Sequence, residues 1–91
     1  MNKSSKNLNR VEPNFFIDIT SEICPMTFVR TKLLIESMSV GDIVDVRLQG
    51  EEALENVPNS ATRMGHKVIS LKPEDEKNTP YGIHRLLIQK L

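Results

Sequence analysis

The stretch DIVDVRLQGEEALENVPNSATRMG, residues 42 to 65, changes its hydrophobic period at Gly50. Before this glycine, apolar and polar residues alternate strictly, which predicts a strand with one buried face. The apolar positions are Val44, Val46 and Leu48, and the polar positions are Asp45, Arg47 and Gln49. After the glycine, apolar residues recur at helical spacing, and these are Leu54, Val57, Ala61 and Met64. We therefore expect a strand followed directly by a helix.

Two residues mark the course of this helix. Gly65 follows the last periodic position, and glycine suits the left-handed backbone just beyond a helix end. Pro58 stands inside the helical pattern and lacks the backbone N–H that a helix uses there. We therefore expect the helix to kink or restart at Pro58 and to end before Gly65.

Upstream, the pattern predicts a strand over residues 15–20 and a helix from Pro25 to about Ser39. Alternate residues of the strand FFIDIT share one side, and these are Phe15, Ile17 and Ile19. Apolar residues of the helix lie four or seven apart: Val29 with Leu33, Leu34 with Met38, and Phe28 with Ile35. Gly41 and Asp42 then make a turn into the next strand.

Downstream, HKVISLK (residues 66–72) and GIHRLLIQKL (residues 82–91) read as two further strands. The segment between them is charged and carries two prolines, which suits an exposed loop. The order is therefore β-α-β-α-β-β. Such a chain covers one sheet face with both helices, so we expect an α/β (α+β) two-layer sandwich.

Composition limits the classes of function. The 91 residues fit one domain, and 12 basic against 12 acidic side chains give no strong electrostatic drive toward nucleic acid or an anionic membrane. One cysteine allows neither an intrachain disulfide nor a metal-site spacing, so we expect no cofactor and a reducing cytoplasm. Residues 1–14 are rich in Asn, Ser and Lys, which predicts a flexible tail ahead of a domain over residues 15–91. No apolar run approaches the roughly 18 residues that span a bilayer.

The single cysteine, Cys24, lies at the junction between the first predicted strand and the first predicted helix. It takes the N-cap position, with Pro25 at the first helical residue, where the missing N–H costs nothing. Free N–H groups and the helix dipole favour an anion there, so we expect a thiol pKa below about 8.5. The same groups would hold the terminal sulfur of a persulfide. The alternative is a buried packing residue, which most single cysteines in small domains are.

Nothing in the sequence places a general base beside Cys24. His66 follows the second predicted helix and His84 lies in the last predicted strand, and we expect both to be surface or half-buried structural residues. A hydrolytic cysteine enzyme would need such a base. A thiol without a base suits sulfur transfer, because a persulfide donor already supplies an electrophilic sulfur and a good leaving group.

The chain resembles the TusA/SirA-like sulfur-carrier family from about residue 15 to residue 91. The resemblance rests on FIDITSEICPMTFVRTKLLIESMSVGDIVDVRL, then ENVPNSATRMGHKV, then HRLLIQK. Its specific elements are Asp18, the pair Cys24–Pro25, the turn Gly41–Asp42, Pro58 and the pair Gly65–His66. The resemblance implies a four-stranded mixed sheet with two helices, and a sulfane sulfur carried on Cys24. It also implies a sulfur-donor protein, such as a cysteine desulfurase or a rhodanese-like protein, and an acceptor protein.

Two positions depart from the usual family pattern. The family motif is commonly Cys-Pro-x-Pro, whereas this chain has Cys-Pro-Met-Thr, with Met26 third and Thr27 fourth; the glycine common three residues before the cysteine is Ser21. Thr27 restores a backbone N–H and adds a hydroxyl, each of which could donate to the Cys24 sulfur. The departures leave the identity of the donor and the acceptor open.

Arg30 and Lys32 follow one to two turns later along the same helix. They are either ordinary solvated helix surface or a basic rim that steers an acidic partner, or an anion such as thiosulfate, toward Cys24. Two main interpretations of the whole protein also stay open. Cys24 turns over as a persulfide in a sulfurtransferase or sulfur carrier, or it is a redox-sensitive cap in a regulatory or protein-binding module of the same fold. RNA binding by analogy of fold has no support from a basic stripe with aromatic residues.

Overall fold

The computed structural model describes residues 12–22, 26–75 and 80–91. Its elements are β1 (Phe15–Asp18), α2 (Met26–Ser37), β2 (Ile43–Leu48), α3 (Glu51–Arg63), β3 (Lys67–Pro73) and β4 (His84–Gln89). This order confirms the β-α-β-α-β-β succession expected from the sequence. None of the helices in the described part is long and apolar enough to cross a membrane.

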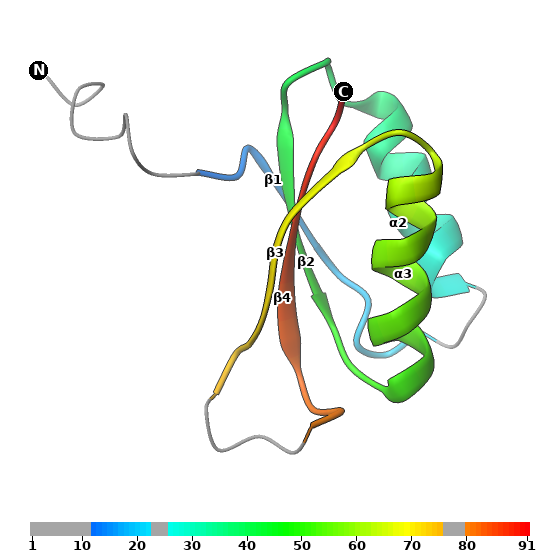
Figure 1. Cartoon of the computed structure of the whole chain (residues 1–91), viewed down its shortest axis with the longest axis vertical. Helices are drawn as coiled ribbons and strands as arrows, with labels where there is room; N and C mark the ends of the chain where they lie inside the picture. The colour runs from blue at the N-terminus through cyan, green and yellow to red at the C-terminus, as the bar shows by residue number, and fades with distance from the viewer. Residues whose placement is uncertain (1–11, 23–25, 76–79) are drawn as a thin grey trace, which may run out of the picture.

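The four strands form one mixed sheet in the order β1-β2-β4-β3. β1 pairs with β2 in parallel, while β4 pairs antiparallel with both β2 and β3. A parallel pair needs a crossover connection, and α2 supplies it between β1 and β2. Both helices lie on the same face of the sheet (Figure 1), so the expected two-layer sandwich is confirmed.

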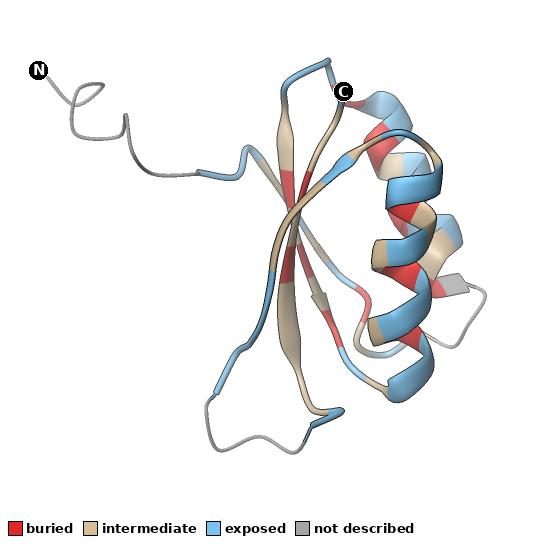
Figure 2. Ribbon diagram, viewed as in Figure 1, coloured by how far each residue is buried: buried red, intermediate tan, exposed pale blue. Residues whose placement is uncertain are grey.

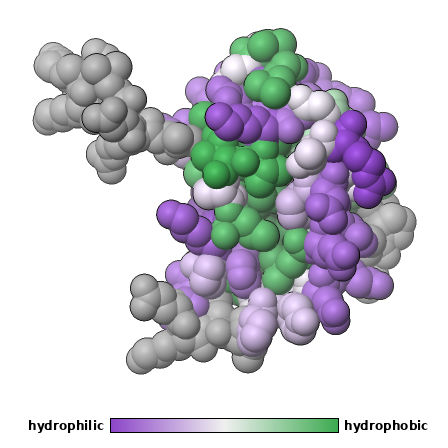
Figure 3. Space-filling view, in the orientation of Figure 1, coloured by the Kyte–Doolittle hydropathy of each residue, from purple (hydrophilic) through white to green (hydrophobic). Residues whose placement is uncertain are grey.

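The core lies between the sheet and the helices, as the buried residues in Figure 2 show. Val44, Val46 and Leu48 of β2 have no exposed surface, which confirms the alternation predicted for this strand. The helix residues that meet the sheet from α3 are Ala53, Val57 and Ala61. Neither of the two described helices lies on the opposite face of the sheet (Figure 1). Figure 3 shows hydrophobic residues grouped on the sheet side of the molecule and mainly hydrophilic surface over the helices.

The buried face of α2 differs from the expected apolar set. Leu33 is 61% exposed and Val29 is 37% exposed, so this pair faces solvent. Ile35 and Met38 of the expected set are buried, and Thr27 and Thr31 are buried with them although they were not in that set. A threonine can occupy a buried helix position when its hydroxyl bonds the preceding turn, and the Thr31 hydroxyl donates to the carbonyl oxygen of Thr27 at 2.9 Å.

Several expected boundaries were wrong. α3 runs through Pro58 from Glu51 to Arg63, so the helix does not restart there; buried residues on both sides of the proline anchor one helix to the sheet. β1 ends at Asp18 because its carboxylate accepts hydrogen bonds from the N–H (2.9 Å) and the hydroxyl (2.7 Å) of Thr20, which turn the chain. α2 ends at Ser37, and β4 spans only His84–Gln89.

The parallel pairing of β1 and β2 gives the sandwich two unlike ends. Each of these strands runs into a connection that leads to a helix, so α2 and α3 both begin at one end, which we call the helix-start end. Both helices finish at the opposite end, which we call the helix-finish end. There Gly65 has a φ of 94°, as predicted, and its N–H and that of His66 cap the last turn of α3.

Candidate functional site

The residues predicted to carry the chemistry belong to the helix-start end, at the beginning of α2. Cys24 and Pro25 lie outside the described residues, and Met26 is the first described residue of α2. Glu22 precedes this segment and Thr27 follows it. Consecutive Cα atoms are about 3.8 Å apart, so covalent connection alone keeps Cys24 within about 11 Å of Thr27, measured between Cα atoms.

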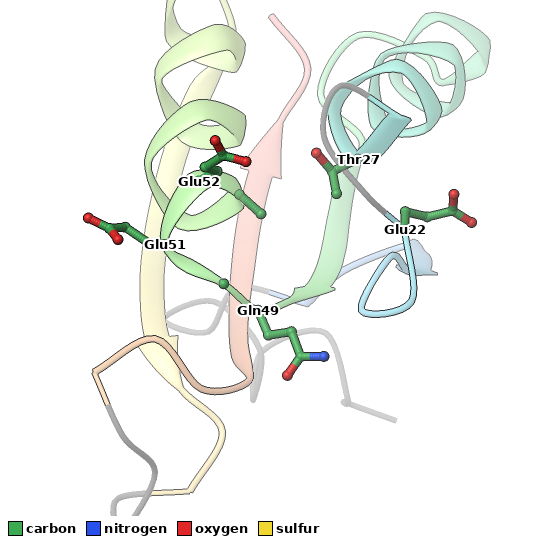
Figure 4. Close-up of a pocket in the computed structure, with 7 residues that line it drawn as sticks. Glu22, Thr27, Gln49, Glu51 and Glu52 are labelled. Carbon is green, nitrogen blue, oxygen red and sulfur yellow. The ribbon is translucent and has the colours of Figure 1, made fainter.

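Thr27 is the most informative of the predicted residues. It is only 2% exposed, and its hydroxyl has no hydrogen-bond partner among the described residues. The side chain lines a hollow of about 260 Å³ between the beginnings of α2 and α3 (Figure 4). The other lining residues are Glu22, Gln49, Gly50, Glu51, Glu52 and Ala53. A buried hydroxyl without a partner is uncommon, because burial removes its hydrogen bonds to water.

The first turn of α3 forms the other wall of this hollow. Its N-cap is Gly50, with a φ of 99°, and no side chain caps the helix. The first helical hydrogen bond runs from the N–H of Leu54 to the carbonyl oxygen of Gly50 at 2.9 Å. The N–H groups of Glu51, Glu52 and Ala53 therefore have no acceptor within the helix. The backbone carbonyl oxygen of Tyr81 accepts the N–H of Gly50 at 2.9 Å and so fixes the start of α3.

The two cations proposed as a basic rim are each paired with a carboxylate. Arg30 donates to Glu22 at 2.7 Å, and the Lys32 ammonium lies 3.8 Å from the Glu36 carboxylate. Both pairs are exposed at the surface of α2 and its approach. Their positive charge is therefore largely balanced within the chain, which favours the solvated-surface interpretation over the steering one.

The two histidines bond to the backbone. The Nδ1 atom of His84 lies 2.8 Å from the carbonyl oxygen of Gly82 and donates to it. The Nδ1 atom of His66 accepts the N–H of Leu91 at 3.3 Å. Both side chains are half-buried, as expected from the sequence. Within the described residues, no cluster of three or more His, Cys, Asp or Glu side chains could hold a metal.

An ion-pair network lies near the helix-start end, on the face of the sheet opposite the two described helices. Arg47 on β2 bonds Asp18 at 3.0 Å and Glu74 at 3.2 Å, while Arg85 on β4 bonds Glu74 at 3.0 Å and Asp45 at 2.9 Å. Hydrogen bonds from Thr20, and then from Arg47, lower the pKa of Asp18. The hydrogen bond from Arg47 also lowers the pKa of Glu74. The network ties three strands and the segment after β3 together.

Sequence reasoning did not find the α3 wall of the hollow. Gln49, Gly50 and the two glutamates after them looked like an ordinary connection from strand to helix. One signal was present: a glycine at the N-cap, where Ser, Thr, Asp or Asn would have satisfied the free N–H groups. Only the packing of α2 against α3 shows that these residues line one hollow together with Thr27.

The site has free backbone N–H groups at the start of α3. The start of α2 lies two residues after Cys24 in the sequence. The first described turn of α2 contains no acidic side chain, whereas that of α3 contains Glu51 and Glu52. The positive end of the α2 dipole is therefore left for another anion. Such an arrangement can stabilise a thiolate or a persulfide anion.

Comparison with known proteins identifies a family and relatives of this chain. The model of the family described as sulfurtransferase TusA matches residues 15–90. A candidate sulfur carrier protein from Archaeoglobus fulgidus is 41% identical over 68 residues, which are 75% of this chain and 77% of that protein. A candidate sulfur carrier protein from Thermotoga maritima is 29% identical over 56 residues, covering 62% of this chain and 71% of its own length.

A solved structure supports the fold independently. The crystal structure of a SirA-like protein from Desulfitobacterium hafniense matches with a TM-score of 0.67 at 22% sequence identity. The match covers 82% of this chain and 95% of that one. The family model covers all six elements, and the relatives support a role as a sulfur carrier. The chain therefore belongs to the TusA family of sulfurtransferases.

Proposed function

We propose that this protein accepts a sulfane sulfur on Cys24 as a persulfide and relays it to an acceptor protein. The observation that carries the proposal is the family match over residues 15–90, a range that includes the only cysteine of the chain. The site residues proposed from the sequence are Cys24 with Pro25, Met26 and Thr27 at the helix start. Arg30 and Lys32 are left as surface residues, because each has a carboxylate partner.

Both halves of the relay are thiol exchange without net oxidation. In loading, the Cys24 thiolate attacks the outer sulfur of a protonated donor persulfide, the S–S bond of the donor breaks, and the donor leaves as a thiolate. Cys24 then carries the outer sulfur and its proton through one new S–S bond. In discharge, an acceptor thiolate attacks that same outer sulfur, and Cys24 leaves as a thiolate. Each step breaks one S–S bond and forms one.

The start of α2 favours Cys24 as both nucleophile and leaving group. Free N–H groups at a helix start stabilise a thiolate, so its population near neutral pH increases. Thr27 keeps a backbone N–H that the more usual family proline would lack. We propose that this N–H donates to the sulfur of Cys24. Thr27→Pro should then slow the alkylation of Cys24 at neutral pH, whereas Thr27→Ala, which keeps the N–H, should not.

A sulfur carrier needs a donor and an acceptor. The family supports both kinds of partner, and we propose a cysteine desulfurase or a rhodanese-like protein as the donor and a cytoplasmic protein as the acceptor. Thiosulfate is a further small sulfur source to test. Direct contact with nucleic acid is not part of the proposal, because the chain carries no net charge.

The test is the intact mass of the purified protein after incubation with inorganic polysulfide. The expected result is the addition of one sulfur atom, which reductant removes and which Cys24→Ser abolishes. Protein that gains no sulfur under these conditions, or that gains it equally in Cys24→Ser, would contradict the proposal. A mass increase of one oxygen atom at Cys24 with no sulfur would instead support the redox-sensitive regulatory module.

A further inference from the structure

We propose that the hollow between the beginnings of α2 and α3 binds a short, extended and positively charged segment of the protein that exchanges sulfur with this chain. The proposal rests on the proposed function for the identity of that protein. The binding itself rests on three features of the hollow: its free donors, its buried hydroxyl and its charge.

The free donors are the N–H groups at the beginning of α3. The amides of Glu51, Glu52 and Ala53 have no acceptor in the helix, and no side chain caps them. The residues that carry these amides line the hollow together with Gly50. Their natural acceptors are carbonyl oxygens or anions. An acceptor for these N–H groups would therefore have to come from outside the described residues.

The buried hydroxyl of Thr27 is a second, independent group that lacks a hydrogen-bond partner among the described residues. It lies across the hollow from α3, and Thr27 is only 2% exposed. In Figure 4 the Thr27 oxygen is turned to the side on which α3 lies. The equally buried Thr31 hydroxyl has its own acceptor in the backbone of Thr27, so a lack of partners is not general for this helix face.

The charge of the hollow decides between the acceptors. Glu51 and Glu52 line it, and Glu55 follows one turn later on the same helix. Among the described residues, no basic side chain lines it, and of the lining carboxylates only Glu22 has an ion-pair partner there, which is Arg30. A free anion would be repelled by the unpaired carboxylates. A neutral carbonyl oxygen with a cation beside it would not be repelled.

An extended peptide supplies both groups together. Its backbone carbonyl oxygens can accept from the free N–H groups of α3 and from the Thr27 hydroxyl, and a neighbouring Lys or Arg side chain can pair with Glu51 or Glu52. Charge complementarity of this kind selects partners and speeds encounter. Glu22, which precedes Cys24 by two residues in the sequence, also lines the hollow, so a segment bound there belongs to a protein close to the sulfur.

The test is a titration of the uniformly ¹⁵N-labelled full chain, without sulfur, with acetyl-Gly-Lys-Gly-Lys-Gly-amide as the probe. The expected result is a saturable shift of the backbone amide signals of Thr27, Glu51, Glu52 and Ala53. The double variant Glu51→Gln/Glu52→Gln should weaken the apparent affinity about fivefold, which is the combined effect of two exposed ion pairs. The matched control, Glu36→Gln, removes an exposed glutamate at the far end of α2 and should leave the affinity unchanged.

Thr27→Val tests the hydroxyl separately. It keeps the shape of the side chain and should weaken binding while leaving the dispersion of the spectrum native. An acidic probe, acetyl-Gly-Glu-Gly-Glu-Gly-amide, should produce no saturable shift. Equal binding of both peptides, or equal losses in Glu36→Gln and in the double variant, would overturn the proposal.

The chain's own basic N-terminal segment is the competing occupant. Lys3→Gln/Lys6→Gln/Arg10→Gln in the full chain should leave the amide signals of the hollow unchanged in the absence of peptide; a shift at Ala53 would assign the hollow to that segment and overturn the proposal. Because all these measurements use unloaded protein, they are independent of sulfur transfer. Loss of loading with retained peptide binding would contradict the proposed function alone, and the reverse would contradict this inference alone.

Discussion

The two ends of the sandwich differ in whether their polar groups have hydrogen-bond partners. At the helix-finish end, the Lys90 ammonium donates to the carbonyl oxygens of Met38 (2.7 Å) and Glu36 (3.3 Å), and the N–H groups of Gly65 and His66 cap α3. At the helix-start end, the described residues leave the Thr27 hydroxyl and the first amides of α3 without partners.

We interpret the closed end as structural and the open end as the functional one. Nearly all buried polar groups in folded proteins are satisfied, so an end that buries the Thr27 hydroxyl without a described partner gives up stability. At the helix-finish end, by contrast, donors from the chain bond carbonyl oxygens in the last turns of both helices. The open groups therefore mark the end at which we place sulfur chemistry and partner binding, and local rules are most often broken at such sites.

The largest stability effect should come from the helix-finish end, at Gly65. Gly65→Ala forces a side chain into the left-handed conformation and should lower the free energy of unfolding by about 1–2 kcal/mol. Urea denaturation followed by circular dichroism measures it. Gly65→Asn tolerates this conformation better and should recover part of the loss. Equal stability of the alanine variant and the parent would show that the cap of α3 matters little.

The next effect should come from Lys90, which closes the end of α2. Lys90→Met keeps an apolar stem but removes two hydrogen bonds to helix carbonyls, and it should cost about 1 kcal/mol. The same denaturation assay measures it, and sulfur loading should be unaffected. The structural role of this end would be contradicted by a variant that keeps its full stability but no longer loads sulfur.

A comparable loss at Thr31, and no loss at Thr27, should distinguish these two buried threonines. Thr31→Val removes a hydroxyl that has a partner and should destabilise by about 1 kcal/mol. Thr27→Val removes one without a described partner and should leave the stability equal or slightly raised. If Thr27→Val loses as much stability as Thr31→Val, the Thr27 hydroxyl has a partner within the folded chain.

The smallest effect should be the acid sensitivity of the network behind the helix-start end. The pKa values of Asp18 and Glu74 are lowered in the folded protein, so their contribution is present above the ordinary values, 3.8 and 4.5, and is lost as the pH falls through the folded values. Melting temperature should therefore fall less between pH 7 and pH 3 in Arg47→Met than in the parent. The difference should shrink in high salt. An unchanged acid profile would show that the network adds no stability.

Sequence reasoning recovered the fold where one residue pattern dominated. The alternation in β2 and the helical spacing in α3 predicted both elements because one face of each is uniformly apolar. The buried face of α2 was predicted only in part: Ile35 and Met38 are buried as expected, whereas the buried Thr27 and Thr31 were not expected there, although threonine methyl groups can be buried. The hollow could not be predicted, because it joins Thr27 to residues 49–53, and that contact depends on the packing of the two helices.

The most direct test of the sulfur-relay claim is exchange between two copies of the protein. Loaded unlabelled protein is mixed with unloaded ¹⁵N-labelled protein, and the intact masses of both are followed over time. The account predicts that one sulfur atom moves from the light chain to the heavy chain until both are equally loaded, and that Cys24→Ser heavy chain receives none. Sulfur that stays on the light chain, or a disulfide-linked pair formed in its place, would contradict the account.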